Sequence, residues 1–128
     1  MPKKKIFIAD DKEDILLLLK DFLLNEDFDV MISKEPLQLV KQIKNFKPDL
    51  LVLDLLMPNL DGFELCQILN NDHETQNVPI IVMSGLKDLA DIKRAYTMGV
   101  VDYYPKPFKL NNMLAGIKKA IANRENPQ

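Results

Sequence analysis

The chain has little of what marks a secreted or membrane-bound protein. Its 128 residues include one cysteine, Cys66, which cannot form a disulfide within the chain and so favours a reducing compartment. No apolar run approaches the roughly 20 residues of a membrane-spanning helix. The charged start, with three lysines at positions 3–5, contains no apolar signal segment. We therefore expect a cytoplasmic protein without a membrane partner.

A strong charge of one sign is also missing. The net charge is −2, which gives no general attraction for nucleic acid, and we expect this chain to bind none directly. The single histidine, His73, lies in the polar stretch 71–77, where a solvated side chain is a simpler interpretation than a metal ligand. The length predicts a single domain over residues 1–128, with a core from about residue 4 to 122 and a polar tail at 123–128.

Short apolar runs that end in polar residues are the main feature that is present. They occupy residues 6–9, 50–53 and 80–83, and a weaker aromatic strand is expected at 100–104. Apolar runs without alternation are typical of strands buried on both faces, as in parallel sheets covered by helices. Residues 28–33 instead alternate apolar and polar side chains, which favours a strand at the sheet edge.

Helical spacing of apolar residues fills the segments between these strands. Helices are expected at 14–25, 36–47, 63–70, 89–96 and 110–121. Pro36 suits a first helical turn, and Gly99 suits the end of the fourth helix. In that helix, Leu89, Ile92 and Tyr96 are expected to mark the apolar face. Five strands alternating with five helices predict one α/β domain.

Chemically active side chains follow the predicted strands. They are Asp10, Asp11, Asp54, Ser84 and Lys106. Parallel strands bring their carboxyl ends to one edge of a sheet, where open α/β folds bind ligands. Crowded carboxylates repel one another, and a divalent cation with a preference for oxygen, Mg²⁺ or Mn²⁺, relieves that repulsion. A simpler alternative is that Asp10 and Asp11 only cap the following helix, but it leaves Lys106 unexplained.

These motifs resemble those of the receiver domain of two-component response regulators, including the chemotaxis regulators. The resemblance covers residues 4–122 and rests on the acidic pair, Asp54, the loop 57–62, Ser84-Gly85 and Lys106-Pro107-Phe108. It implies a flavodoxin-like, doubly wound parallel sheet of five strands in the order 2-1-3-4-5, with five helices.

The resemblance also implies roles for individual residues. Asp54 would be the phosphoacceptor, and Asp11, Asp54 and the backbone carbonyl of Leu56 would coordinate Mg²⁺, with Asp10 acting mainly through water. Lys106 would neutralise charge during phosphoryl transfer, and Ser84 would donate to a phosphoryl oxygen.

Further positions would adjoin the phosphate or transmit the signal. Gly85 leaves its backbone N–H approachable, and Pro107 is expected to follow a cis peptide bond. Ser84 and Tyr103 would form the switch that changes the face made by the fourth helix, the last strand and the last helix. The competing view is that Tyr103 is only a half-buried strand aromatic.

Partners follow from the same resemblance. A histidine kinase or histidine phosphotransfer protein would phosphorylate Asp54, and a downstream protein or a fused output domain would receive the signal. The chain would catalyse only its own phosphorylation and dephosphorylation, so it is not expected to be an enzyme in the ordinary sense. Leu56 and Leu86, two residues beyond Asp54 and Ser84, would shield the phosphoryl group from water and lengthen its lifetime.

Two alternatives remain at this point. A haloacid-dehalogenase-type phosphatase also uses a strand-end aspartate, but it needs a second aspartate where this chain has Leu56. A receiver fold that binds partners without phosphorylation is the other. The chain also departs from winged-helix regulators, because Val101, Asn112 and Gly116 stand where charged residues are usual, which puts a salt-bridged dimer in doubt.

Overall fold

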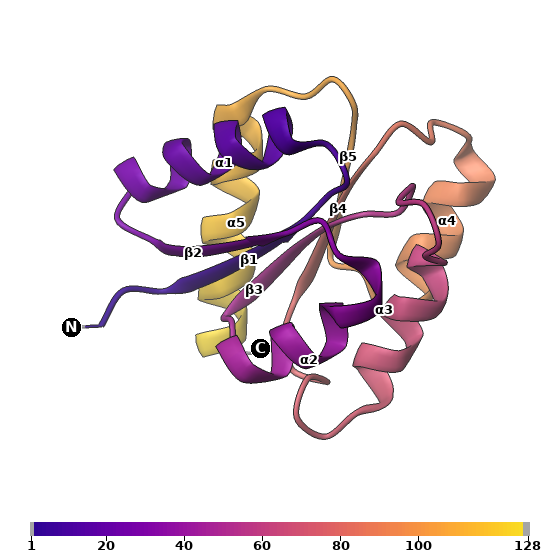
Figure 1. The fold of residues 1–128 in the computed structure, drawn as a ribbon, viewed down its shortest axis with the longest axis horizontal. Coiled ribbons are helices and arrows are strands. Elements are labelled where there is room, and N and C mark those ends of the chain that lie inside the picture. Colours follow the sequence, from indigo (N-terminus) through magenta and orange to yellow (C-terminus); the bar gives the residue numbers. More distant parts are fainter. Residues whose placement is uncertain (1, 127–128) are drawn as a thin grey trace.

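The computed structural model describes residues 2–126 and contains one parallel sheet (Figure 1). The strands are β1 (Lys5–Ala9), β2 (Asp29–Ser33), β3 (Leu50–Asp54), β4 (Ile80–Ser84) and β5 (Asp102–Pro105), in the order β2-β1-β3-β4-β5. The helices are α1 (Glu13–Asn25), α2 (Leu39–Phe46), α3 (Gly62–Asn71), α4 (Leu89–Thr97) and α5 (Leu110–Glu125). The predicted fold class and strand order are confirmed.

The central strands are buried because helices cover both faces of the sheet. Every residue of β3 and β4 is buried, as the uninterrupted apolar runs predicted. Within residues 2–126, β2 pairs only with β1, with Ile6 opposite Val30, and so lies at an edge as expected. Ile32 packs against the core on one face of the sheet, and Met31 packs against the core on the other face. The second face of β2 is therefore less polar than the alternation of the sequence suggested.

The helices form two layers, α1 and α5 on one face of the sheet and α2, α3 and α4 on the other (Figure 1). The first core contains Leu16, Leu19, Leu23, Met113, Ile117 and Ile121, and the second contains Leu39, Ile43, Phe63, Leu69 and Ala95. Each fully buried aliphatic side chain contributes about 1.5–3 kcal/mol, so the two layers hold the sheet as a firm base for its loops.

Three predicted boundaries were wrong by a few residues. Residues 36–38 form a short 3-10 helix (Pro36–Gln38) before α2 begins, which turns the side chain of Leu37 into solvent. The last strand starts at Asp102, where its pairing with Ile81 of β4 begins, rather than at residue 100. The predicted tail at 123–128 is wrong for 123–125, because α5 continues to Glu125; residues 127–128 lie outside the described part.

The expected apolar face of α4 was wrong in part, because Ile92 packs partly buried against the core but its two companions do not. Leu89 is 65% exposed and Tyr96 is 45% exposed, and the buried residue of the helix is the small Ala95. Helical spacing identified the helix correctly, but spacing alone does not say which side of a short helix meets the core. No helix among residues 2–126 is long and apolar enough to cross a membrane.

Candidate functional site

Asp10, Asp11 and Asp54 converge at the carboxyl edge of the sheet. β1 and β3 are adjacent and in register, with Ala9 opposite Leu53, so the residues after them emerge side by side. One carboxylate oxygen from each of the three acids lies within 4.8 Å of the others. Asp10 and Asp54 are buried, and the Asp10 N–H donates to the carbonyl of Ser33 on the edge strand at 3.2 Å. The predicted acidic cluster therefore forms.

Lys106 supplies the one cation that contacts this cluster within residues 2–126. Its Nζ lies 2.7 Å from Asp10 Oδ2 and 3.2 Å from Asp54 Oδ2. Burial alone would lower the pKa of Lys106, but the hydrogen bond to Asp10 and the charge of Asp54 outweigh burial and raise it. The lysine is therefore held protonated in the cleft, as a charge-neutralising role requires.

Burial also raises the pKa of Asp10, with a further contribution from the negative charge of Asp54. The hydrogen bonds from Lys106 and from the Lys12 N–H act in the opposite direction and only partly offset it. The carboxylate groups thus meet at an electrostatic cost that a single lysine does not remove.

The oxygen donors fit a divalent cation. Asp11 Oδ1 is buried and lacks a hydrogen-bond partner among the described residues, an arrangement that normally needs an ion or water. Asp54 Oδ1 accepts from the Leu56 N–H at 2.9 Å, which turns the start of the following loop toward the cleft. Carboxylate and carbonyl oxygens are the ligands that Mg²⁺ and Mn²⁺ prefer.

The loop between β3 and α3 is shaped by its own polar and small residues. Asp61 caps α3 by accepting from the backbone N–H groups of Phe63 and Glu64, at 3.0 and 3.1 Å. Gly62 lies so close to Leu55 that a Cβ there would stand 2.7 Å from the Leu55 Cα. The helix can therefore start directly beside the strand end.

Leu56 forms part of the rim of the cleft. Its side chain is 51% exposed, and its Cδ1 would be 3.8 Å from a Cβ added to Gly85 in the neighbouring loop. Leu86 packs partly against the core beneath. The two leucines thus lie on the loops that follow β3 and β4, and their shielding role stays a prediction.

Tyr103 is buried rather than half-buried, and its burial fits a strand aromatic as well as a switch residue. Its hydroxyl donates to the backbone carbonyl of Leu86 at 2.8 Å, and burial raises its pKa. Ser84, fully buried, accepts from the Leu86 N–H at 3.2 Å. Sequence reasoning considered only the side chain of Leu86 and missed its backbone, which joins Ser84 to Tyr103.

The loop after β5 carries Lys106 into the cleft. The Lys106 N–H donates to the carbonyl of Ser84 at 2.8 Å, and the Lys106–Pro107 peptide bond is cis, as expected. Beside the cleft lies a mainly apolar pocket of about 410 Å³, lined by Ile15, Leu18, Leu19, Lys106, Pro107, Phe108 and Leu110. Sequence reasoning did not predict this pocket.

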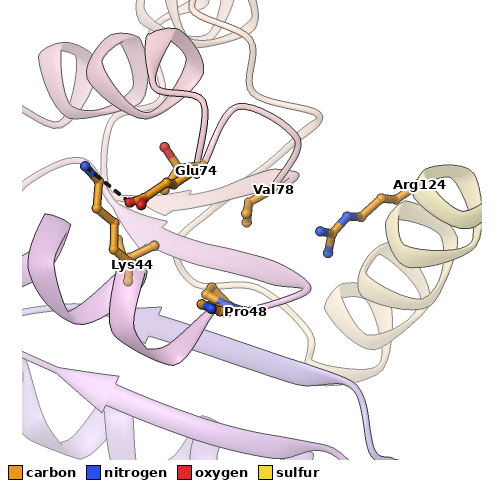
Figure 2. Close-up of a pocket in the computed structure, with 8 residues that line it drawn as sticks. Lys44, Pro48, Glu74, Val78 and Arg124 are labelled. Atoms are coloured by element: carbon orange, nitrogen blue, oxygen red, sulfur yellow. Dashed lines mark ion pairs between the residues drawn. The ribbon is translucent and has the colours of Figure 1, made fainter.

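A second pocket, of about 370 Å³, lies between α2, the loop that follows α3, and α5, away from the acidic cluster (Figure 2). Two of the cations that line it, Lys44 and Arg124, already have acidic partners. Lys44 pairs with Asp72 at 2.6 Å and with Glu74 at 3.6 Å, and Arg124 donates to Asp49 Oδ1 at 3.2 Å. His73, in the same loop as Glu74, contributes to no metal cluster found among residues 2–126. The chemistry therefore lies at the carboxyl edge.

Comparison with known families gives one match over most of the chain. Residues 6–118 match the response regulator receiver domain. A CheY-like receiver domain protein from Methanospirillum hungatei has a similar structure, with a TM-score of 0.91, 25% identity and coverage of 98% of this chain and 99% of that one. The BeF3-activated receiver domain of RstA from Klebsiella pneumoniae gives a TM-score of 0.85 at 26% identity, covering 92% and 98%.

Curated relatives are longer than this chain. A DNA-binding response regulator, MtrA, from Mycolicibacterium smegmatis is 28% identical over 123 residues, which are 96% of this chain and 53% of the relative. A probable transcriptional regulator, ycf27, from Porphyridium aerugineum is 33% identical over 134 residues, covering 99% and 55%. The chain thus spans about half the length of the curated relatives it matches.

Proposed function

Because the chain belongs to the response regulator receiver domain family, we propose that it is a phosphorylation-dependent signalling receiver with Asp54 as its phosphoacceptor. The observation that carries this proposal is the cluster of Asp10, Asp11 and Asp54, two of them buried, with Lys106 bridging two of the three carboxylates. A structural cap would need neither the third acid nor the lysine. A histidine kinase or histidine phosphotransfer protein is the proposed donor.

Each step of the proposed transfer has a residue to carry it. An oxygen of Asp54 attacks phosphorus, the donor's phosphorus–nitrogen bond breaks, and that electron pair returns to the donor imidazole. Lys106, held protonated, faces the added negative charge, and Ser84 can donate its hydroxyl proton to a phosphoryl oxygen. Asp10, Asp11, Asp54 and the carbonyl of Leu56 would hold Mg²⁺, which supplies further charge neutralisation when bound. The chain modifies only itself in this scheme.

The donor must reach Asp54 from outside, and the apolar pocket beside Lys106 offers a surface for it. Leu18 is 53% exposed there, next to Pro107 and Phe108. An apolar helix face of a donor protein could cover these side chains while its histidine enters the cleft.

The proposed signal then leaves on the opposite side, through Ser84, Leu86 and Tyr103, to the face of α4, β5 and α5. A downstream protein or a fused output domain would bind that face.

One observation favours a second candidate, a receiver fold that binds partners without phosphorylation. The Tyr103 side chain is already buried and hydrogen-bonded to Leu86 in this structure. If that position is permanent, the face around it never changes. A haloacid-dehalogenase-type phosphatase has no comparable support, because Leu56 provides no carboxylate for general acid catalysis.

The test is phosphorylation with a small phosphodonor and Mg²⁺, followed by intact-protein mass spectrometry. We expect one added phosphoryl group in the natural chain and none in Asp54→Asn. Asp21→Asn, at an exposed acid on α1, is the matched control and should be phosphorylated normally. Phosphorylation that persists in Asp54→Asn would overturn the assignment. A modified protein whose Tyr103 environment is unchanged by near-ultraviolet circular dichroism would favour the second candidate.

A further inference from the structure

β2 leaves one edge of the sheet open. It pairs only with β1 among residues 2–126, and Figure 1 shows α1 lying along it. The Asp29 N–H donates to the carbonyl of the residue before β1 at 2.9 Å, and the Ser33 carbonyl accepts a bond of 3.2 Å from the residue after β1. Because successive residues of a strand bond alternately to either side, Val30 and Ile32 direct their N–H and C=O groups away from β1. Neither lysine nor proline, which commonly block an edge, interrupts residues 29–33.

α1 turns a stripe of exposed side chains toward the same edge. Glu13 Oε2, in its first turn, lies 3.7 Å from Nζ of Lys34, which follows β2, so this side of the helix faces the edge. The residues four and eleven positions after Glu13 share that side, because eleven residues make about three helical turns. They are Leu17, which is 46% exposed, and Leu24, which is 42% exposed. Two exposed leucines therefore stand beside the open strand.

The strand and the stripe have the same centre. Met31 is the middle residue of β2 and lies about 10 Å before Lys34, at about 3.3 Å per residue. The midpoint between Leu17 and Leu24 lies about 11 Å along α1 from Glu13, at about 1.5 Å per residue. Since Glu13 contacts Lys34 and the helix runs antiparallel to the strand, that midpoint is level with Met31. A two-fold axis through Met31 would therefore also pass between the two leucines.

From this coincidence we propose that β2 and α1 form an interface with a second copy of this chain. The two β2 strands pair in the antiparallel sense, with Met31 opposite itself and Val30 opposite Ile32 of the copy. Val30 and Ile32 then exchange both of their N–H···O bonds, and the symmetry repeats this pair on the other side of the axis. Two five-stranded sheets join into one, and the open edge disappears. The other side of α1, with Leu18, remains free for the phosphodonor.

The charges of α1 favour a second copy over an unrelated partner. The axis that brings Leu17 to Leu24 of the copy also brings Lys20 to Asp21 of the copy, because both pairs are centred on the same point of the helix. Neither Lys20 nor Asp21 forms an ion pair with another of residues 2–126. Opposite charges thus meet on both sides of the axis, and complementary charges of this kind fix the register of an interface.

Sedimentation velocity of the chain over roughly 5–500 µM, without a phosphodonor, tests the interface. The contact is small, so we expect a monomer at the lowest concentration and a dimer at the highest. Lys20→Asp places like charges across the axis and should raise the dissociation constant by about tenfold or more. Lys20→Asp combined with Asp21→Lys restores opposite charges and should restore the dimer. Lys118→Asp, at an exposed position of α5, is the matched control and should leave the dimer unchanged.

A cross-link tests the register of the strands. The Cα atoms of a non-hydrogen-bonded antiparallel pair are about 4.5 Å apart, a distance that a disulfide can bridge. Met31→Cys should therefore cross-link to itself when copper phenanthroline is added, whereas Asp29→Cys, which faces Ser33 of the copy, should not. Cys66 is buried and does not compete. A chain that stays monomeric throughout, a dimer that Lys20→Asp does not weaken, or a dimer without the Met31→Cys cross-link overturns the proposal.

Discussion

The ammonium of Lys106 lies closer to Asp10, at 2.7 Å, than to Asp54, at 3.2 Å. The shorter bond goes to the carboxylate that is not proposed to react. Asp54 thus shares a cation with a neighbour while its own charge faces two other acids. The site is held in an unfavourable electrostatic arrangement by the surrounding sheet, as is common where function and stability compete.

We expect Asp54→Asn to stabilise the chain when divalent ions are removed. Two like charges about 5 Å apart repel by roughly 3 kcal/mol at an effective dielectric of 20, and the lost bond to Lys106 offsets part of the gain. A net increase of about 1–2 kcal/mol in the free energy of unfolding should result. Urea unfolding in a chelator measures it.

Asp21→Asn is again the matched control and should change the stability by less than about 0.5 kcal/mol, as exposed substitutions usually do. Added Mg²⁺ should stabilise the natural chain more than Asp54→Asn, because binding to the folded state alone raises stability by mass action. A destabilised Asp54→Asn in chelator would contradict the idea that the acids repel.

The lifetime of the phosphorylated state should depend on the two rim leucines. If Leu56 and Leu86 shield the phosphoryl group, as their positions predict, their apolar side chains cannot orient an attacking water. If one missing water-orienting contact raises the hydrolysis barrier by about 1.4 kcal/mol, the lifetime grows about tenfold. We therefore expect Leu56→Asn combined with Leu86→Glu to lose phosphate faster than the natural chain. The measurement is loss of phosphate from Asp54 after removal of the donor, and equal rates would exclude the leucines as the cause.

Gly116 should be intolerant of a methyl group because of Tyr104. The Tyr104 hydroxyl donates to Asp102 Oδ2 at 2.7 Å, and a Cβ at residue 116 would overlap that hydroxyl and stand 2.9 Å from the carboxylate. Alanine gains about 1 kcal/mol of helix propensity over glycine but displaces a hydrogen bond to a charged group, worth about 1.5–3 kcal/mol. We expect Gly116→Ala to destabilise the natural chain.

A double-mutant cycle isolates this contact. In a Tyr104→Phe background the hydroxyl is gone, so the cost of Gly116→Ala should fall by at least half. Additive costs in the two backgrounds would mean that the hydroxyl does not set the requirement for glycine. The same contact bears on the salt-bridged dimer of winged-helix regulators. Asp102 accepts a hydrogen bond from Tyr104 within the chain, and that bond competes with a salt bridge to a partner.

The sequence predicted most of the site because the chemistry lies at strand ends. Apolar runs located the strands, and a parallel sheet brings Asp10, Asp54 and Ser84 to one edge whatever the loops do. What sequence reasoning could not predict depends on contacts between segments far apart in the chain. The bond from Tyr103 to the Leu86 backbone and that from Asn70 to Met98 leave no periodic signal.

The same distinction explains the errors in the helices. The five helices were identified from their spacing, but the apolar face of α4 was assigned to Leu89, Ile92 and Tyr96, of which Leu89 and Tyr96 are exposed. A nine-residue helix with few apolar residues offers more than one plausible face, and the small Ala95 is chosen by how closely α4 approaches the sheet. Packing decides which face of α4 meets the core, and the spacing of apolar residues predicts that packing poorly.

The thiol of Cys66 should resist modification and contribute a pH dependence to stability. Burial is the main reason that its pKa rises from 9.0 to about 12. Below pH 9 both the folded and the unfolded chain keep the proton, so the full stability is present there. Between pH 9 and 12 the unfolded chain loses the proton and the folded chain keeps it, so stability falls as pH rises.

We expect the difference in unfolding free energy between the natural chain and Cys66→Ala to shrink by about 1.4 kcal/mol for each pH unit above 9. Subtracting the variant removes the contribution of the tyrosines, which titrate in the same range. A thiol reagent at pH 8 should react with the urea-unfolded chain much faster than with the folded one. A difference that does not change with pH would mean that the thiolate is accommodated in the folded protein.

The order of the strands along the chain has a consequence for the newly made protein. Pairing of β1 with β3 gathers Asp10, Asp11 and Asp54, yet Lys106 comes 52 residues after Asp54. At a synthesis rate of roughly 5–20 residues per second, the ribosome needs about 3–10 seconds to deliver that lysine. During this interval a nascent chain that pairs β1 with β3 holds three acids without their built-in counterion. The magnesium of the surrounding solution would then be the first cation to stabilise the emerging fold, before it takes part in any signal.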